Sequence, residues 1–325
     1  MVDYGLPVLF ALFVWWFSTG VVLYLGRRPR GTYRWSMLGM TVVLGLSTVA
    51  LVLTSSLTTP LGAYLAFTAG LLIWGWHEMA FLMGFLVGAR TEPCPEDATG
   101  YDRFVAAFAA INHHELAILG TGIIVIALAW DAPNPVGAWT FAVLWGMRIS
   151  AKLNVYLGVP NLAEEFLPDH LAYLKTYFRN RRINLLFPVS VTVGALFTAA
   201  LVHLAVGAPA GSFEAAAYTL VAALSGLAVI EHWLLVLPLP DAALWHWALP
   251  TEPGDPGVRK DLGQPDAGAP GGVASVKVAL EADHKAATIA AFAGPGRFRN
   301  PPRRRAQEPA AAMRTHRAGP VKTGR

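Results

Sequence analysis

The amino-acid sequence predicts an all-α protein, namely a polytopic membrane bundle of about seven transmembrane helices followed by a disordered cytoplasmic tail. The chain has 325 residues, of which 54% are hydrophobic and only 14% are charged, whereas soluble domains carry about 25% charged residues. Its mean hydropathy is +0.45. The apolar residues form long blocks rather than alternating or one-faced patterns. These observations exclude a cytosolic globular enzyme and a fibrous or wholly disordered protein.

Seven apolar segments are long enough to cross a bilayer, because a helical span needs about 20 mostly apolar residues. The first has no basic region before it and no small-residue cleavage site, so we expect a retained span rather than a signal peptide. The predicted spans are 5–26, 36–56, 61–89, 104–130, 136–158, 183–207 and 213–237.

Basic residues occupy alternate loops and so predict the orientation. The first, third and fifth loops carry all the loop arginines and lysines, and the second, fourth and sixth carry none. We therefore expect a multi-pass protein of the bacterial inner (intracytoplasmic) membrane. Its N-terminus would be periplasmic and its C-terminus cytoplasmic.

The chain divides by composition into a membrane domain, 1–250, and a tail, 251–325. The first part holds 12 Lys+Arg and 14 Asp+Glu (12 − 14 = −2), and the tail holds 13 and 7 (13 − 7 = +6). The tail also contains 10 Gly and 9 Pro, so it buries too little apolar surface to fold and is predicted to be disordered. Its arginine runs would face anionic headgroups. No nucleic-acid-binding signature is present, and we expect no nucleic-acid partner.

Charge-capable side chains gather in four of the predicted spans, where they are costly and therefore indicate function. They are His77 and Glu78, then His113, His114 and Glu115, then Arg148, Lys152 and Asn154, and finally Glu231 and His232. A further acidic loop follows the fifth span and contains Glu164, Glu165 and His170.

The depth of these residues predicts that they converge. A helix rises about 1.5 Å per residue. His77 then lies 12 residues (89 − 77), or about 18 Å, from the cytoplasmic end of its span, and His113 lies 9 residues (113 − 104), or about 14 Å. Lys152 (158 − 152) and Glu231 (237 − 231) each lie 6 residues, or about 9 Å, from that end. We infer one buried site in the cytoplasmic half of the membrane, with the acidic loop as its lid.

Carboxylates and imidazoles at matched depth are the ligands of a non-haem iron or manganese centre. The pairs here are adjacent, unlike the Glu-x-x-His spacing of bundle di-iron sites, so usually only one member of each pair would face the metal. The candidate metal ligands are His77, Glu78, His113, His114, Glu115, Glu164, Glu165, His170, Glu231 and His232.

Two other interpretations are open. Arg148 or Lys152 would neutralise the carboxylates in a closed polar network that includes Asn154 and fixes helix register without chemistry. Alternatively, a neutral histidine would ligate the central metal of bacteriochlorophyll or haem, with tryptophans such as Trp74 and Trp233 beside the macrocycle.

Four stretches together resemble the photosynthetic complex assembly protein 2 family, PuhE. They are Trp76-His77-Glu78, Asn112 to Leu116, Asn154 to Tyr177 and Glu231-His232-Trp233. The resemblance covers about residues 1–250. It implies a multi-spanning inner-membrane protein, encoded near the reaction-centre H subunit of purple phototrophic bacteria, that supports reaction-centre or light-harvesting assembly and affects bacteriochlorophyll supply. It implies no catalytic site.

The sequence leaves several functions open. One is an assembly factor that binds photosynthetic complex subunits or pigment intermediates within the bilayer. Another is a membrane-embedded di-iron or manganese oxidoreductase that acts on a tetrapyrrole or isoprenoid intermediate. A proton-coupled transporter ranks third, because no internal repeat is visible.

Overall fold

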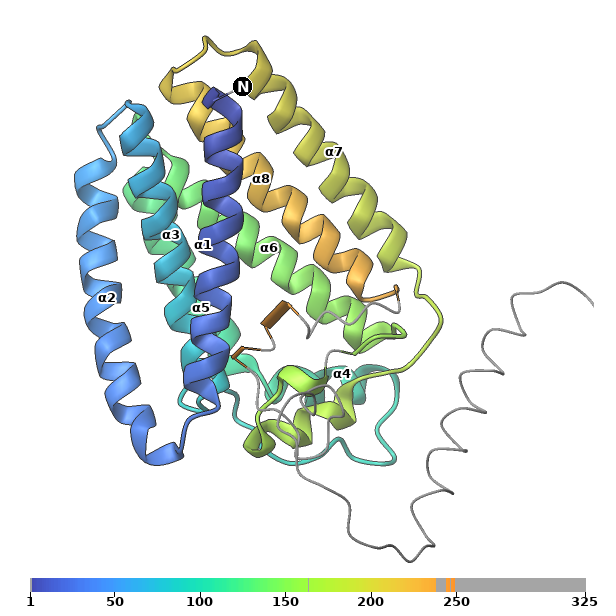
Figure 1. Cartoon of the computed structure of the whole chain (residues 1–325). Helices are drawn as coiled ribbons and strands as arrows, with labels where there is room; N and C mark the ends of the chain where they lie inside the picture. Colours follow the sequence, from blue (N-terminus) through green and yellow to red (C-terminus); the bar gives the residue numbers. More distant parts are fainter. Residues whose placement is uncertain (1, 163, 238–243, 246, 249–325) are drawn as a thin grey trace, which may run out of the picture. The chain divides into compact units, whose positions relative to one another are not determined.

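The computed structural model describes residues 2–162, 164–237, 244–245 and 247–248, and the regular elements of this part are helices (Figure 1). Their connections place successive long helices antiparallel to one another. The eight α-helices are α1 (Val2–Gly26), α2 (Tyr33–Thr54), α3 (Pro60–Leu82), α4 (Gly100–Ala109), α5 (Asn112–Ala129), α6 (Val136–Leu157), α7 (Leu186–Gly207) and α8 (Phe213–Leu234). Short 3₁₀ turns lie at Arg30–Thr32 (η1), Glu164–Phe166 (η2) and Asp169–Tyr177 (η3).

The all-α multi-pass prediction is confirmed. Within the described residues, six helices are long and apolar enough to cross a membrane, namely α1, α2 (with η1), α3, α5, α7 and α8. The remaining predicted span, 136–158, is the 22-residue helix α6. It is not among the six, because Arg148, Lys152 and Asn154 lower its hydropathy. It nevertheless packs within the bundle, against α3, α5 and α8.

Two predicted spans were too long. The span 61–89 ends as a helix at Leu82, and 104–130 is divided into α4 and α5. The chain after α3 folds back onto the junction of α4 and α5, where the backbone N–H of His114 donates to the Val87 carbonyl at 2.9 Å. The Ala89 N–H donates to Asn112 Oδ1 at 2.9 Å. Because these groups are satisfied outside a helix, neither helix continues through the junction.

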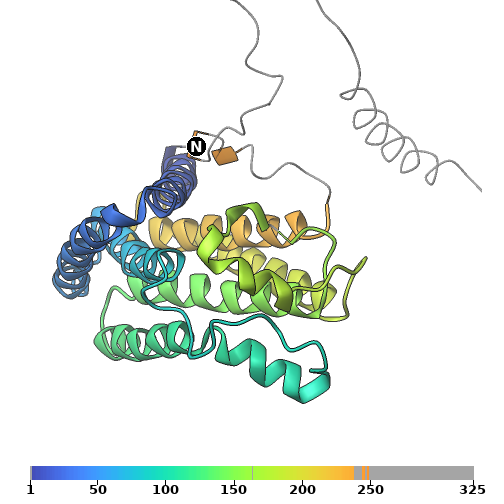
Figure 2. The same cartoon turned by 90° about the horizontal axis from the view of Figure 1, so that it is seen from below.

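The bundle is built around α3, α6 and α8, which pack against one another (Figure 2). α2 lies against α3, α5 against α6 and α3, and α7 against α8. The α3–α6 contact is close, because a Cβ at Gly70 would collide with the Gly137 backbone. Glycine at this position therefore lets the two helix backbones approach.

Two asparagines join helices at opposite ends of α6. The Asn134 amide nitrogen donates to the carbonyls of Thr54, Leu57 and Gly62 at 3.0–3.1 Å. The Asn184 amide nitrogen donates to Asn154 and Gly158 at the end of α6, and its oxygen accepts from the first N–H groups of α7. These side chains satisfy helix-terminal groups that would otherwise be unpaired.

The segments after α3 and α6, together with α4, pack into a cap at one end of the bundle. Buried Arg103 donates to the Tyr177 carbonyl at 2.6 Å and lies 4.5 Å from the Tyr156 ring centroid. Arg90 Nε donates to the Tyr177 hydroxyl at 2.9 Å. The cap carries the third and fifth loops, whose basic residues predicted the cytoplasmic side. The predicted tail, 251–325, and its basic runs lie outside the described residues.

Candidate functional site

The charged side chains lie at one level near the capped end of the bundle. Glu78 is 4 residues from the end of α3 (82 − 78), Glu115 is 3 from the start of α5 (115 − 112) and Lys152 is 5 from the end of α6 (157 − 152). Glu231 is 3 from the end of α8 (234 − 231). At about 1.5 Å per residue, these depths are about 5–8 Å. The site is shallower than the sequence predicted, because the helices end earlier.

Two ion pairs connect three helices at this level. Lys152 Nζ lies 2.6 Å from Glu115 Oε1, which joins α6 to α5. Arg148 Nη2 lies 3.0 Å from Glu78 Oε2, which joins α6 to α3. The carboxylates are mostly buried, each with 16% of its side chain exposed, whereas the exposed fractions are 21% for Lys152 and 42% for Arg148. Charges on neighbouring spans thus neutralise one another inside the bundle.

Two histidines border these ion pairs. His77 Nε2 lies 3.0 Å from Thr121 Oγ1 on α5. His114 is completely buried, and its Nε2 lies 3.9 Å from Glu78 Oε1. Among the described residues, neither ring nitrogen of His114 has a hydrogen-bond partner, and neither does Glu78 Oε1. Of these three atoms, His114 Nε2 and Glu78 Oε1 are the two that face each other.

The candidate metal ligands are only partly brought together. Within the part of the chain that the structure describes, no group of three or more His, Cys, Asp or Glu residues is arranged to hold a metal ion. His113 is exposed, whereas the adjacent His114, which points about 100° away around α5, is buried. Glu231 is also exposed, and its carboxyl accepts a hydrogen bond from the Trp15 side chain on α1.

The residues predicted as a lid lie in the cap. Glu164 is 3.8 Å from Lys175, and both side chains are substantially exposed. Glu165 is in η2, and its side chain is outside what the structure describes. His170 contacts the end of α3: its ring bonds to the Leu82 carbonyl, and it lies 3.1–3.2 Å from where a Cβ on Gly84 would be. Burial, and secondarily the Arg30 charge, lower the pKa of His170.

A second polar group lies on the other side of α6 and carries no net charge. His232 Nε2 lies 2.9 Å from Ser150 Oγ, and His232 Nδ1 lies 2.8 Å from the Ala228 carbonyl oxygen. Ser150 Oγ is also 2.9 Å from Ser190 Oγ. The Asn154 amide donates to Ser190 Oγ at 3.0 Å, and Asn154 is completely buried.

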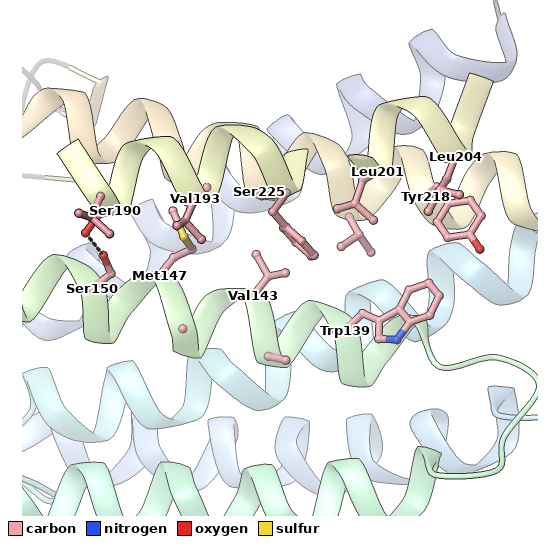
Figure 3. Close-up of a pocket in the computed structure, with 16 residues that line it drawn as sticks. Trp139, Val143, Met147, Ser150, Ser190, Val193, Leu201, Leu204, Tyr218 and Ser225 are labelled. Carbon is pink, nitrogen blue, oxygen red and sulfur yellow. Dashed lines mark hydrogen bonds between the residues drawn. The ribbon is translucent and has the colours of Figure 1, made fainter. Parts of the chain in front are cut away.

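This uncharged group borders a groove of about 760 Å³ between α6, α7 and α8 (Figure 3). Figure 3 shows Ser150 and Ser190 at one end of the groove and Trp139 and Tyr218 at the other. The Trp139 and Tyr218 rings stack with centroids 5.9 Å apart. We call this the α6–α7–α8 groove. Its lining residues are Trp139, Ala142, Val143, Gly146, Met147, Ser150, Val189, Ser190, Val193, Gly194, Phe197, Leu201, Leu204, Tyr218, Val221 and Ser225.

Sequence reasoning missed Ser150 and Ser190, although it singled out His232 and Asn154. Single serines in an apolar span are common and carry no distinctive pattern. One signal was available. Ser150 and Asn154 are spaced i, i+4 on α6, as are Arg148 and Lys152, so each pair shares a helix face. The two faces are about 160° apart around the helix axis.

The fold and these contacts define a class, a multi-pass α-helical membrane protein whose helices are joined by ion pairs and buried hydrogen bonds. Residues 1–255 match the family described as protein of unknown function DUF3623. The chain belongs to this family. It is 39% identical over 250 residues to an uncharacterized 30.4 kDa protein in the puhA 5′ region of Rhodobacter capsulatus, an alignment that covers 76% of this chain and 91% of the relative. No solved structure is significantly similar to the chain.

Proposed function

We propose that this protein supports the assembly of photosynthetic reaction-centre or light-harvesting complexes and the supply of bacteriochlorophyll to them. It acts as a multi-pass protein of the inner (intracytoplasmic) membrane, with a periplasmic N-terminus and a cytoplasmic C-terminus. The observation that carries the proposal is the 39% identical relative, whose description places it in the puhA 5′ region. The resemblance to the PuhE family supports the same function.

The geometry is compatible with a role that needs no turnover. The ion pairs Lys152–Glu115 and Arg148–Glu78 tie α6 to α5 and α3, so the bundle is held in one register. Helix α2 presents a row of exposed apolar side chains that includes Leu38, Val42 and Leu46. Such a face contacts lipid or the spans of another membrane protein, and the partners we propose are photosynthetic complex subunits or pigment intermediates.

A deletion strain tests this function. Membranes lacking the protein should contain less reaction-centre and light-harvesting complex by absorbance, and expression of the full chain should restore them. The pigment pool separates assembly from synthesis: an assembly factor should lower complexes without accumulation of a single pigment precursor. Normal amounts of both complexes in the deletion strain would refute the proposal.

A membrane-embedded di-iron or manganese oxidoreductase is the second candidate, and one observation favours it. His114 and Glu78 Oε1 are buried without hydrogen-bond partners among the described residues and are 3.9 Å apart, a separation that one bridging cation can span. Metal analysis of the purified full chain tests this candidate. Stoichiometric iron or manganese that is lost on His114→Ala would support it, and metal-free protein that restores the complexes in the deletion strain would exclude it. Tetrapyrrole ligation by a histidine stays a prediction.

A further inference from the structure

The hydrogen bonds of His232 determine which of its nitrogens can act as a base. The Ala228 carbonyl can only accept a hydrogen bond, so His232 Nδ1 carries the proton of that 2.8 Å contact. In the neutral ring, Nε2 is then an acceptor, and it lies 2.9 Å from Ser150 Oγ. A serine hydroxyl within hydrogen-bond reach of an imidazole that is oriented by a third group is the arrangement of an activated nucleophile.

The environment of Ser150 supplies the other parts of an acyl-transfer site. Ser150 is only partly buried and lines the α6–α7–α8 groove. Ser190 Oγ accepts two hydrogen bonds, from the Ser150 hydroxyl at 2.9 Å and from the Asn154 amide at 3.0 Å. For attack on a substrate, the Ser150 hydroxyl turns from Ser190 Oγ to His232 Nε2, which lies 2.9 Å from Ser150 Oγ. With the amide satisfying its oxygen, the Ser190 hydroxyl can donate to a carbonyl oxygen placed beside Ser150.

The groove indicates the class of substrate. None of the described residues that line it is charged, so a charged headgroup would find no counter-ion there. Between Ser150 and Trp139 the groove follows 11 residues of α6 (150 − 139), or about 16 Å. The exposed side chains Val189, Val193 and Phe197 on α7 border it, so a molecule dissolved in the bilayer can enter from the side. This shape fits an extended hydrocarbon chain with an uncharged polar group at the Ser150 end.

We propose that Ser150 and His232 form a nucleophile–base pair that cleaves a long-chain carboxylic ester bound in the α6–α7–α8 groove. Ser150 Oγ bonds to the ester carbonyl carbon while its proton passes to His232 Nε2. The bond from that carbon to the alcohol oxygen breaks, and the same proton goes to the departing alcohol. Water then attacks the acyl-serine, gives a proton to His232, and releases the carboxylic acid as the proton returns to Ser150.

The proposal requires water for the second step to enter from the capped end. Ser150 lies 7 residues from the end of α6 (157 − 150), or about 10 Å. This esterase activity goes beyond the proposed assembly role. The labelling test and the deletion-strain test are independent, so either proposal can be refuted while the other stands. A purely structural Ser150–His232 contact would give the same distances but no reactivity.

The test is covalent labelling of the purified full chain, in detergent, with a long-chain alkyl fluorophosphonate, followed by mass spectrometry of the modified peptide. We expect one adduct, on Ser150, although Ser225 lines the same groove. Ser225 Oγ lies 2.8 Å from Thr198 Oγ1 rather than near a base, so it should not react. An unmodified Ser150 in folded protein would overturn the proposal.

Three variants distinguish reactivity from packing. His232→Gln retains a group that can bond to Ser150 but removes the base, so labelling should slow by about 100-fold or more. An unchanged rate in folded His232→Gln protein would also overturn the proposal. Gly146 lines the groove, and no atom in the described part of the chain lies within 4 Å of a Cβ at that position, so Gly146→Leu has room to extend. The variant should block labelling by the long-chain probe but not by a short dialkyl fluorophosphate. Equal loss of labelling by the two probes would exclude the groove as the binding site of the hydrocarbon chain. Ser47→Ala removes a buried serine on α2 and is the control. It should be labelled at the same rate as the protein without substitutions.

Discussion

The two faces of α6 join this helix to its neighbours through different kinds of interaction. One face places Arg148 and Lys152 against carboxylates on α3 and α5 at 3.0 and 2.6 Å. The opposite face places Ser150 and Asn154 against α7 and α8 and uses only neutral hydrogen bonds. The charged face holds helices together strongly, because either charge without its partner would be stranded in a low-dielectric interior. The neutral face costs less to break and leaves a groove open beside it.

The largest expected effect comes from breaking the charged face. Lys152→Met leaves Glu115 buried without its cation and should destabilise the folded protein by about 3–5 kcal/mol. Unfolding of the purified protein in a denaturing-detergent titration measures this loss. Lys175→Met is the matched control, because its 3.8 Å pair with Glu164 is much more exposed and should contribute at most about 1 kcal/mol. Equal losses for the two variants would contradict the assignment of Lys152 to a buried pair.

Forcing α3 and α6 apart is a second way to disturb the charged face, which joins these two helices. Gly70→Ala places a Cβ against the Gly137 backbone and should cost about 1–3 kcal/mol through overpacking. Gly120→Ala on α5 meets no atom of the described residues within 4 Å and should be neutral or slightly stabilising. Thermal unfolding of the two variants side by side measures the difference. If Gly70→Ala melts no lower than Gly120→Ala, the two backbones are not in contact.

The neutral face should show a smaller effect on stability. Ser150→Ala removes hydrogen bonds to His232 and Ser190, and interhelical hydrogen bonds in membrane proteins contribute about 0.6 kcal/mol, with a maximum of about 1.7. The same detergent titration should therefore show a clearly smaller shift than Lys152→Met. A loss as large as that of Lys152→Met would show that the two faces are energetically alike.

The smallest effect is the pH dependence of the cap. The pKa of His170 is lowered in the folded protein, so the unfolded chain binds more protons near pH 6.5 and below. Stability from neutral His170 is fully present above about pH 6.5 and decreases as the pH falls through the unfolded value. His170→Gln should weaken this dependence, as measured by unfolding at pH 7.5 and pH 5.5. If the stability of the variant decreased more steeply between pH 7.5 and pH 5.5 than that of the native protein, the lowered pKa of His170 would be contradicted.

The sequence predicted the helices better than the way in which their polar side chains pair. Long apolar blocks were sufficient to predict the helices, and depth along each span predicted that Glu78, Glu115 and Lys152 lie at a common level. Rotation about each helix axis could not be predicted, because neighbouring residues point about 100° apart. His114 is therefore completely buried while adjacent His113 is exposed. The end of α3 had a local signal, because Gly84 adopts a φ of 80° directly after the helix and Phe85 N–H donates to the Ala80 carbonyl. The contacts that place residues 87–89 against the start of α5 are tertiary hydrogen bonds and could not be predicted from the sequence.

The central claim is that buried charges in this bundle are neutralised by each other, and a double-mutant cycle on Lys152 and Glu115 tests it most directly. The variants Lys152→Met, Glu115→Leu and the double variant would be unfolded under identical conditions, with metal content measured in each. We predict that the double variant loses clearly less stability than the sum of the two single losses. The resulting coupling should lie in the range of about 1–3 kcal/mol, with no dependence on metal content. Additive losses, or a stability that follows bound metal rather than Lys152, would contradict this account.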